Sequence, residues 1–187
     1  HHTTITPCQK EYLLAFHKPA GIVCTTSKID KNNVIDYLNF PERIYPVGRL
    51  DKESTGLLLL TNNGQLMDDI LRGSNYHEKE YIVHVNKPIT DSVLQAMAQG
   101  VPILDTITRP CKIRRMGKDC FYITLTQGLN RQIRRMCEYF DYRVTSLKRI
   151  RIMNIELGSL PVGKWRELTP SEIKTLKNLA QNKGEAE

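Results

Sequence analysis

The spacing of apolar and polar residues along the chain predicts a series of strands. Residues 56–61 form a continuous apolar run bounded by turn residues, which is typical of a strand buried on both faces. Residues 79–85 alternate instead, with Tyr81, Val83 and Val85 on one face, and this indicates a strand with one buried face. Shorter runs predict further strands at 12–16, 21–26, 111–116, 120–126 and 163–168, and two more within 142–157.

Other segments have the spacing of amphipathic helices. In 130–140 the apolar residues stand at i, i+3, i+4 and i+7, which predicts a helix with one buried stripe. Similar patterns predict helices at 34–38, 65–71 and 90–100, and a last helix that begins after Thr169 with Pro170 in its first turn. Because strands outnumber helices and follow one another closely, we expect an α+β domain with a mixed, largely antiparallel sheet and flanking helices.

The chain of 187 residues is long enough for one substantial core, or for two small lobes that share one. It contains no repeat, long linker or low-complexity block, so we expect a single domain at 11–180. Residues 1–10 are interpreted as an N-terminal tail or a cloning remnant, and residues 181–187 as a frayed polar tail.

The cysteines and the lack of long apolar runs indicate the compartment. Five scattered cysteines without a C-x-x-C pair favour neither a disulfide framework nor a zinc site. No run approaches the ~18 apolar residues of a membrane span. We therefore expect a reduced, soluble, cytoplasmic protein that does not bind a membrane.

The positive charge is moderate in amount but clustered. Lys and Arg number 27 against 20 Asp and Glu, a formal net charge of +7. The groups are Lys112, Arg114 and Arg115, then Arg131, Arg134 and Arg135, then Lys148, Arg149 and Arg151. Such clusters bind phosphates irrespective of sequence, which favours a nucleic-acid partner.

Asp51 is the strongest candidate for chemistry. It lies in a loop flanked by Gly48 and Arg49, just before the predicted buried strand. A single carboxylate there can act as a nucleophile or a base, provided that a cation keeps it ionised. The plain alternative is a structural turn before a core strand. Asp68 and Asp69 are expected on the solvated face of a helix, and a supporting role for Glu53 stays open.

The predicted helix 130–140 offers a cation. At about 100° per residue, Arg134 lies on the flank of the apolar stripe, whereas Arg131 and Arg135 fall nearer the solvent side. A flanking arginine can present its guanidinium in a cleft; the alternative is a surface pair with Glu138. By pattern alone, Tyr81 is a core residue, although its ring could also face a nucleobase.

Three segments, taken together, resemble the motifs of the RsuA-type branch of bacterial pseudouridine synthases. Residues 48–51 with 55–58 are similar to the catalytic motif, 79–81 to the second motif and 130–136 to the third. The turn at 18–21 is also similar to an opening turn of that family, and the resemblance runs from about residue 13 to 168.

The resemblance implies isomerisation of uridine to pseudouridine in folded RNA, with base flipping and without a metal or an organic cofactor. It implies that Asp51 is the catalytic aspartate, that Arg134 pairs with it and that Tyr81 stacks on the target base. Ile133 would form the apolar wall under the base. The further substrate contacts expected from the motifs are Arg49, Asn130, Arg131 and Gln132.

The resemblance also implies a partner and a domain. The RNA would be a hairpin of 23S ribosomal RNA, with tRNA as the other class, and the protein is expected to be a monomer. Family members commonly carry an S4-like RNA-binding domain at the N-terminus, and the segment before Leu13 is too short for one. Either the chain is a trimmed form or the protein works without that domain.

Other functions stay open from the residues alone. A catalytically silent RNA-binding or ribosome-assembly module would explain the arginine clusters and aromatics equally well, but not an acid held in a Gly- and Arg-flanked loop. A metal-dependent nuclease would need two or more carboxylates at one site, and no second motif acid is evident.

Overall fold

The computed structural model describes residues 10–72 and 76–181. Most of the predicted tails at 1–10 and 181–187, namely residues 1–9 with Cys8 and residues 182–187, lie outside the described residues. Gln181, which was expected to belong to a frayed tail, is instead the last residue of the final helix.

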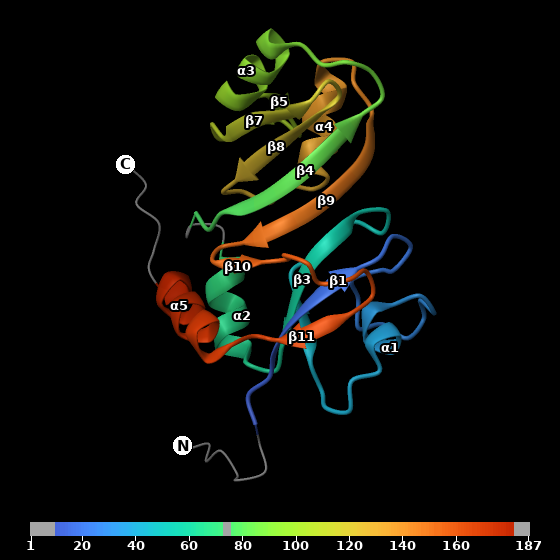
Figure 1. Ribbon diagram of the computed structural model, residues 1–187, viewed down its shortest axis with the longest axis vertical. Helices are drawn as coiled ribbons and strands as arrows, with labels where there is room; N and C mark the ends of the chain where they lie inside the picture. The colour runs from blue at the N-terminus through green and yellow to red at the C-terminus, as the bar shows by residue number, and fades with distance from the viewer. Residues whose placement is uncertain (1–9, 73–75, 182–187) are drawn as a thin grey trace.

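One twisted sheet runs through the described part of the chain (Figure 1). Its strand order is β11 (Trp165–Glu167), β1 (Leu13–Lys18), β3 (Thr55–Thr61), β9 (Val144–Ile152), β4 (Lys79–Val85), β8 (Cys120–Leu125) and β7 (Lys112–Gly117). In addition, β2 (Tyr45–Val47) pairs with β3, and β10 (Ile155–Glu156) pairs with β9. The pairing is antiparallel except between β3 and β9, which confirms a mixed, largely antiparallel sheet.

The parallel contact between β3 and β9 joins two halves of the molecule (Figure 1). In one half, α3 (Asp91–Gln99) and α4 (Gln132–Tyr139) pack with β4 and β8 around a core that contains Val83, Phe121 and Met136. In the other half, α2 (Gly64–Leu71) and α5 (Pro170–Gln181) cover one face of β1 and β3, and α1 (Val34–Leu38) covers the other. A small separate hairpin, β5 (Pro102–Ile103) with β6 (Thr106–Ile107), follows α3.

The β3 strand is buried on both faces, as its continuous apolar run predicts. Leu57 and Leu59 belong to the core under α2 and α5, while Leu58 and Leu60 belong to the core under α1. At its start the strand approaches β9 so closely that a Cβ on Gly56 would lie 2.2 Å from the carbonyl oxygen of Arg149. Glycine, with a φ of 112° there, is therefore required for the junction of the two halves.

Three expectations about local structure are wrong. Residues 21–26 form a loop with a single bridge from Val23 to Asn33, because β1 is already paired on both sides, with β3 and β11. The helix predicted at 130–140 begins later, at Gln132. Asp69 is buried rather than solvated, because Gln65 donates to its carboxylate and His77 lies against its carbonyl.

The remaining predicted helices and strands are present, although their bounds differ slightly. Thr169 accepts from the backbone N–H of Glu172, whose carboxylate accepts from Thr169 N–H, so that this pair caps α5 as predicted. In the described ranges, none of the helices combines the length and the apolar character that crossing a bilayer requires.

Candidate active site

A cavity of about 630 Å³ lies where the two halves meet. Its walls come from the loop between β2 and β3, the start of β4, the segment 125–133 that leads into α4, and two residues of β9. Asp51, Tyr81, Ile133 and Arg49 all line it, so segments far apart in sequence contribute to one site.

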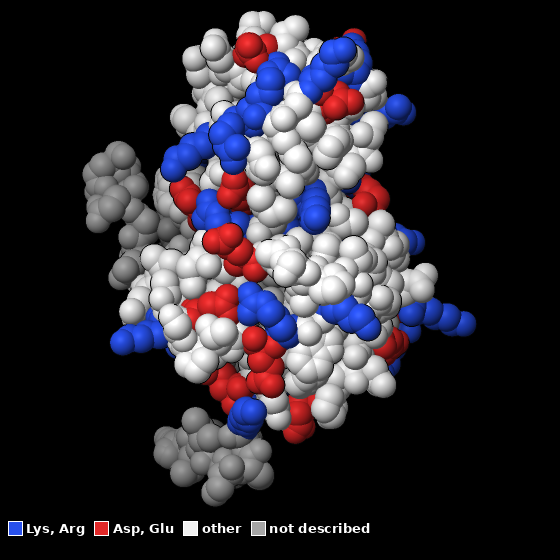
Figure 2. Space-filling model, in the orientation of Figure 1, with Lys and Arg blue, Asp and Glu red and all other residues white. Residues whose placement is uncertain are grey.

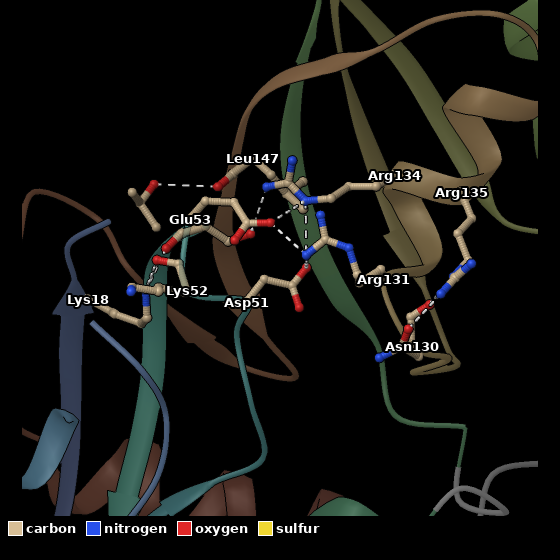
Figure 3. A network of polar contacts seen from close by, with 11 residues as sticks. Lys18, Asp51, Lys52, Glu53, Asn130, Arg131, Arg134, Arg135 and Leu147 are labelled. Carbon is tan, nitrogen blue, oxygen red and sulfur yellow. Dashed lines mark hydrogen bonds and ion pairs between the residues drawn. The ribbon is translucent and has the colours of Figure 1, made fainter. Parts of the chain in front are cut away.

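Asp51 lies beside two arginines from the α4 segment (Figure 3). Its Oδ2 is 3.6 Å from Nη1 of Arg131 and 3.6 Å from Nε of Arg134, and its side chain is 30% exposed. The ion pair expected between Asp51 and Arg134 is therefore present. Attack or proton removal by Asp51 uses its carboxylate oxygens, and both guanidinium groups lie beside that group.

Glu53 shares the same two arginines. Its Oε1 lies 2.6 Å from Nη1 of Arg131 and 3.6 Å from Nε of Arg134. The hydrogen bond from Arg131 is the main cause that lowers the pKa of the Glu53 carboxyl. Glu53 therefore contacts the same two cations as Asp51, and its supporting role stays a prediction.

Arg134 contacts the second half of the loop, at Asp51, Glu53 and Ser54. Its Nη2 donates to Ser54 Oγ at 3.1 Å, and its side chain is only 11% exposed. Its Nε is buried without a hydrogen-bond partner, 3.6 Å from each carboxylate. No ion pair with Glu138 is found among the described residues, so the surface alternative for Arg134 does not hold.

Arg131 is 40% exposed, in line with its expected position nearer the solvent side, but it also reaches the site. It precedes α4 in a left-handed conformation with φ 49° and ψ 39°. Helical angles do not apply to it, and its side chain spans Asp51 and Glu53 (Figure 3). Arg135, by contrast, turns away and donates to Asn130.

Gln132 and Asn130 line the cavity but serve mainly the loop itself. Gln132 is 5% exposed, accepts from Leu129 N–H and donates to Gln127. Asn130 accepts from Arg135 through its side-chain and backbone oxygens. Their expected contacts with substrate therefore stay predictions.

Lys18 supports the Asp51 loop from the interior. The residue is fully buried, and its ammonium donates to the carbonyl oxygens of Pro19, Lys52 and Ser54 at 2.9, 3.1 and 2.7 Å. Burial lowers the pKa of this ammonium. From the sequence, the turn at 18–21 was noted only for its resemblance to the family. The role of Lys18 was not predicted, because the sequence pattern does not show that a lysine at the end of a strand is buried.

The third basic group is largely internal and does not form a free phosphate-binding surface. Arg149 is 3% exposed, and its Nε donates to Leu57 O. Arg151 pairs with Glu78 and Glu80. In the first group, Arg115 pairs with Asp91. Carboxylates distant in sequence, which a charge count ignores, thus pair with Arg115 and Arg151, whereas Arg149 bonds to a backbone carbonyl.

The family model of RNA pseudouridylate synthase matches residues 12–139. The chain belongs to this family. The dual-specificity RNA pseudouridine synthase RluF of Salmonella typhi is 54% identical over 90% of this chain and 58% of that relative. The ribosomal large subunit pseudouridine synthase B of Bacillus subtilis is 34% identical over 89% of this chain and 71% of that relative. The chain thus spans less than two thirds of the length of its RluF relatives.

Solved structures of the family have the same fold. A crystal structure of a pseudouridylate synthase covers 92% of this chain and 76% of its own, with 30% identity and a TM-score of 0.82. The human RNA pseudouridylate synthase domain containing 1 covers 95% of this chain and 94% of its own. At 14% identity and a TM-score of 0.52, that second likeness concerns the fold alone.

Proposed function

We propose that the protein isomerises uridine to pseudouridine within folded RNA and that Asp51 is the catalytic group. The observation that carries the proposal is the carboxylate of Asp51 at the wall of a nucleotide-sized cavity, with Arg131 and Arg134 beside it. Family membership and the names of the relatives, which are RNA pseudouridine synthases, support the same reaction.

The reaction replaces the bond between C1′ of the ribose and N1 of uracil by a bond from C1′ to C5. Asp51 promotes loss of N1 by attack on C1′, by attack on the base or by removal of the 2′ proton. The freed ring rotates, C5 joins C1′, the C5 proton leaves to a base and N1 takes up a proton. No atom is gained or lost overall, so the site must retain the detached ring while it turns.

The shape of the cavity suits such a ring. The base must leave its helix, because its glycosidic bond is out of reach while it is stacked. Tyr81 is half-buried at the cavity and offers an aromatic face, and Ile133, at 4% exposure, supplies an apolar wall. Stacking on an aromatic ring replaces the stacking that the base loses in the RNA.

The RNA is proposed to be ribosomal RNA of the large subunit, a 23S hairpin, with tRNA as a second substrate. The name of the Bacillus relative supports the first class, and the dual specificity in the name of the Salmonella relative is consistent with two substrates. We further propose that the enzyme acts as a monomer in the cytoplasm. The molar mass measured by sedimentation, with and without RNA, tests whether the protein is a monomer.

Release of tritium from RNA that carries 5-tritiated uridine tests the proposed function. The wild-type protein should release tritium in step with pseudouridine formation, since the C5 proton is lost only after rearrangement. Asp51→Asn should remain folded and bind RNA but lose turnover, because an amide is neither a nucleophile nor a base. Turnover of Asp51→Asn within about tenfold of wild type would remove Asp51 from the chemistry. Binding without any turnover by the wild type would favour a silent RNA-binding module.

A further inference from the structure

Two cations at the cavity wall have no carboxylate partner among the described residues. Lys79 is the first residue of β4, and Arg149 lies on the neighbouring strand β9; both line the cavity. Tyr81 pairs in register with Arg149, so their side chains leave the sheet on the same face. Lys79 lies two residues before Tyr81 on β4, across a shift in register with β9 at Glu80 and Tyr81, and lines the same cavity.

Arg149 is deeply buried but incompletely satisfied. At 3% exposure, its Nε donates to Leu57 O at 2.8 Å, whereas its Nη2 is buried without a hydrogen-bond partner. A buried charged donor that lacks an acceptor is costly, and native structures rarely retain one without a reason.

The ammonium of Lys79 is destabilised both by its burial and by the positive charge of the neighbouring Arg149. Burial and the positive charge of Arg149 lower the pKa of the Lys79 ammonium to about 8. The carboxylates of the site do not relieve this, because Asp51 and Glu53 pair with Arg131 and Arg134 instead. An electron-rich group of the substrate is therefore the natural partner for both cations.

We propose that Lys79 and Arg149 bind the carbonyl oxygens of the target uracil and stabilise the negative charge that the ring gains when it leaves the ribose. This inference rests on the proposed function. When the C1′–N1 bond breaks, its electron pair stays on N1 and is delocalised onto O2 and O4 of the ring. Fixed cations at those oxygens lower the barrier because they interact more strongly with the charged ring than with neutral uridine.

The base, rather than a phosphate, fits this position. Lys79 and Arg149 line the same cavity as Tyr81, whose ring is proposed to stack on the same base. Phosphates of a bound RNA lie outside the base, where Arg49 and Lys52 are exposed at the cavity. An interior pair of cations is thus placed for the ring, and an exposed pair for the backbone.

Single-turnover kinetics of Lys79→Met, Lys79→Arg and the control Lys87→Met test the proposal. Lys87 follows the far end of β4, pairs with Asp141 and does not line the cavity. Lys79→Met should lower the rate of isomerisation about 100-fold with little change in RNA affinity, the loss expected for one charge-stabilising donor. Lys79→Arg should retain most of the rate, and Lys87→Met all of it.

The pH profile and the melting temperature give independent readouts. At RNA concentrations well below saturation, the wild-type rate should fall as the pH rises through about 8, where Lys79 of the free enzyme loses its proton, and Lys79→Arg should move this fall to higher pH. Because Lys79→Met removes a charge that Arg149 repels, its Tm should stay equal or rise.

Each alternative role predicts a different result. Weaker RNA binding with a smaller salt dependence, at an unchanged rate, would mean that Lys79 holds a phosphate and would overturn the proposal. A lower Tm in both Lys79 variants would indicate a structural residue, and a normal rate for Lys79→Met would also refute the idea. An inactive wild type would instead sink the proposed function itself.

Discussion

At the scale of single residues, the site is a balance between two carboxylates and two arginines. Arg131 lies 2.6 Å from Glu53 but 3.6 Å from Asp51, so the carboxylate outside the proposed chemistry holds the shorter contact. Glu53 thereby limits how strongly Arg131 can hold Asp51 before the RNA arrives. An ion pair that is too tight would make the aspartate a weaker nucleophile and base.

Arg134 and Arg131 should therefore differ in the step that they affect. Arg134 is nearly buried and tied to Ser54, so Arg134→Ala should lower kcat about 100-fold or more. Arg131 is 40% exposed, and Arg131→Ala should mainly raise KM for RNA. Arg135→Ala, which alters only a contact with Asn130, is the matched control. Equal losses of kcat in Arg131→Ala and Arg134→Ala would contradict this division.

Tyr81 can be assigned by comparing stability with turnover. Its ring contacts two apolar clusters as well as the cavity, so a change at this position tests both roles at once. Tyr81→Phe should keep most RNA binding and slow only the proton loss that follows C–C bond formation. Tyr81→Leu should lose the stacking energy, roughly 1–3 kcal/mol per base.

The assignment fails if the ring serves only the core. Measuring Tm and turnover for the wild type, Tyr81→Phe and Tyr81→Leu distinguishes the two roles. A much lower Tm in Tyr81→Leu with near-normal turnover per folded molecule would return the residue to a structural role.

At the scale of elements, the Asp51 loop is fixed by its neighbours rather than by its own sequence. Lys18 at the end of β1 bonds to the carbonyls of Lys52 and Ser54, and the thiol of Cys24 accepts from Leu50 N–H. The segment 21–26, which was expected to be a strand, thus supports the loop. A loop held on both sides of Asp51 keeps the carboxylate in one place without substrate.

Lys18→Met should weaken both the fold and the reaction without touching the RNA. It leaves buried carbonyl oxygens without donors, which should lower the free energy of unfolding by about 2–4 kcal/mol. Well below its Tm, the variant should still show a lower kcat, because Asp51 is less firmly placed. Lys164→Met, an exposed lysine in the same half, serves as the control. A full kcat at a reduced Tm would limit Lys18 to stability.

The order of apolar and polar residues predicted most elements: a continuous apolar run predicted β3, and helical spacing predicted α3. The N-cap and Pro170 predicted α5. The start of α4 was misplaced because Arg131 is in a left-handed conformation, which favours glycine or asparagine and is not expected of arginine. Asp51 and Arg134 could be named in advance, since one lies in a distinctive loop and the other on a helix flank. The buried Lys18 and Arg149 could not, because their partners are backbone carbonyls of distant segments.

At the scale of the whole molecule, net charge overstates the free positive surface. Lys and Arg side chains gather on the half that contains β7 and β8, whereas red and blue alternate over the other half in this view (Figure 2). Several of the clustered arginines form ion pairs, among them Arg115 with Asp91 and Arg151 with Glu78 and Glu80. Only cations without such partners are free to neutralise RNA phosphates and so displace the counterions that are condensed on the RNA.

The salt dependence of RNA affinity should therefore depend on a few residues. We expect affinity to fall steeply as the salt concentration rises. A plot of the logarithm of the binding constant against the logarithm of the salt concentration has a slope of about −0.7 for each neutralised phosphate of a single strand. Arg49 and Lys52 are exposed at the cavity and form no ion pair with another described residue. Replacing both residues by alanine should reduce the magnitude of this slope by about 1.4, the contribution of two phosphates.

Arg151→Ala should instead lower Tm and leave the slope unchanged, because its charge is already neutralised. Titrations of a fluorescent RNA hairpin over a series of salt concentrations measure both, and an equal loss of slope in Arg151→Ala would show that the ion-paired arginines also bind phosphates.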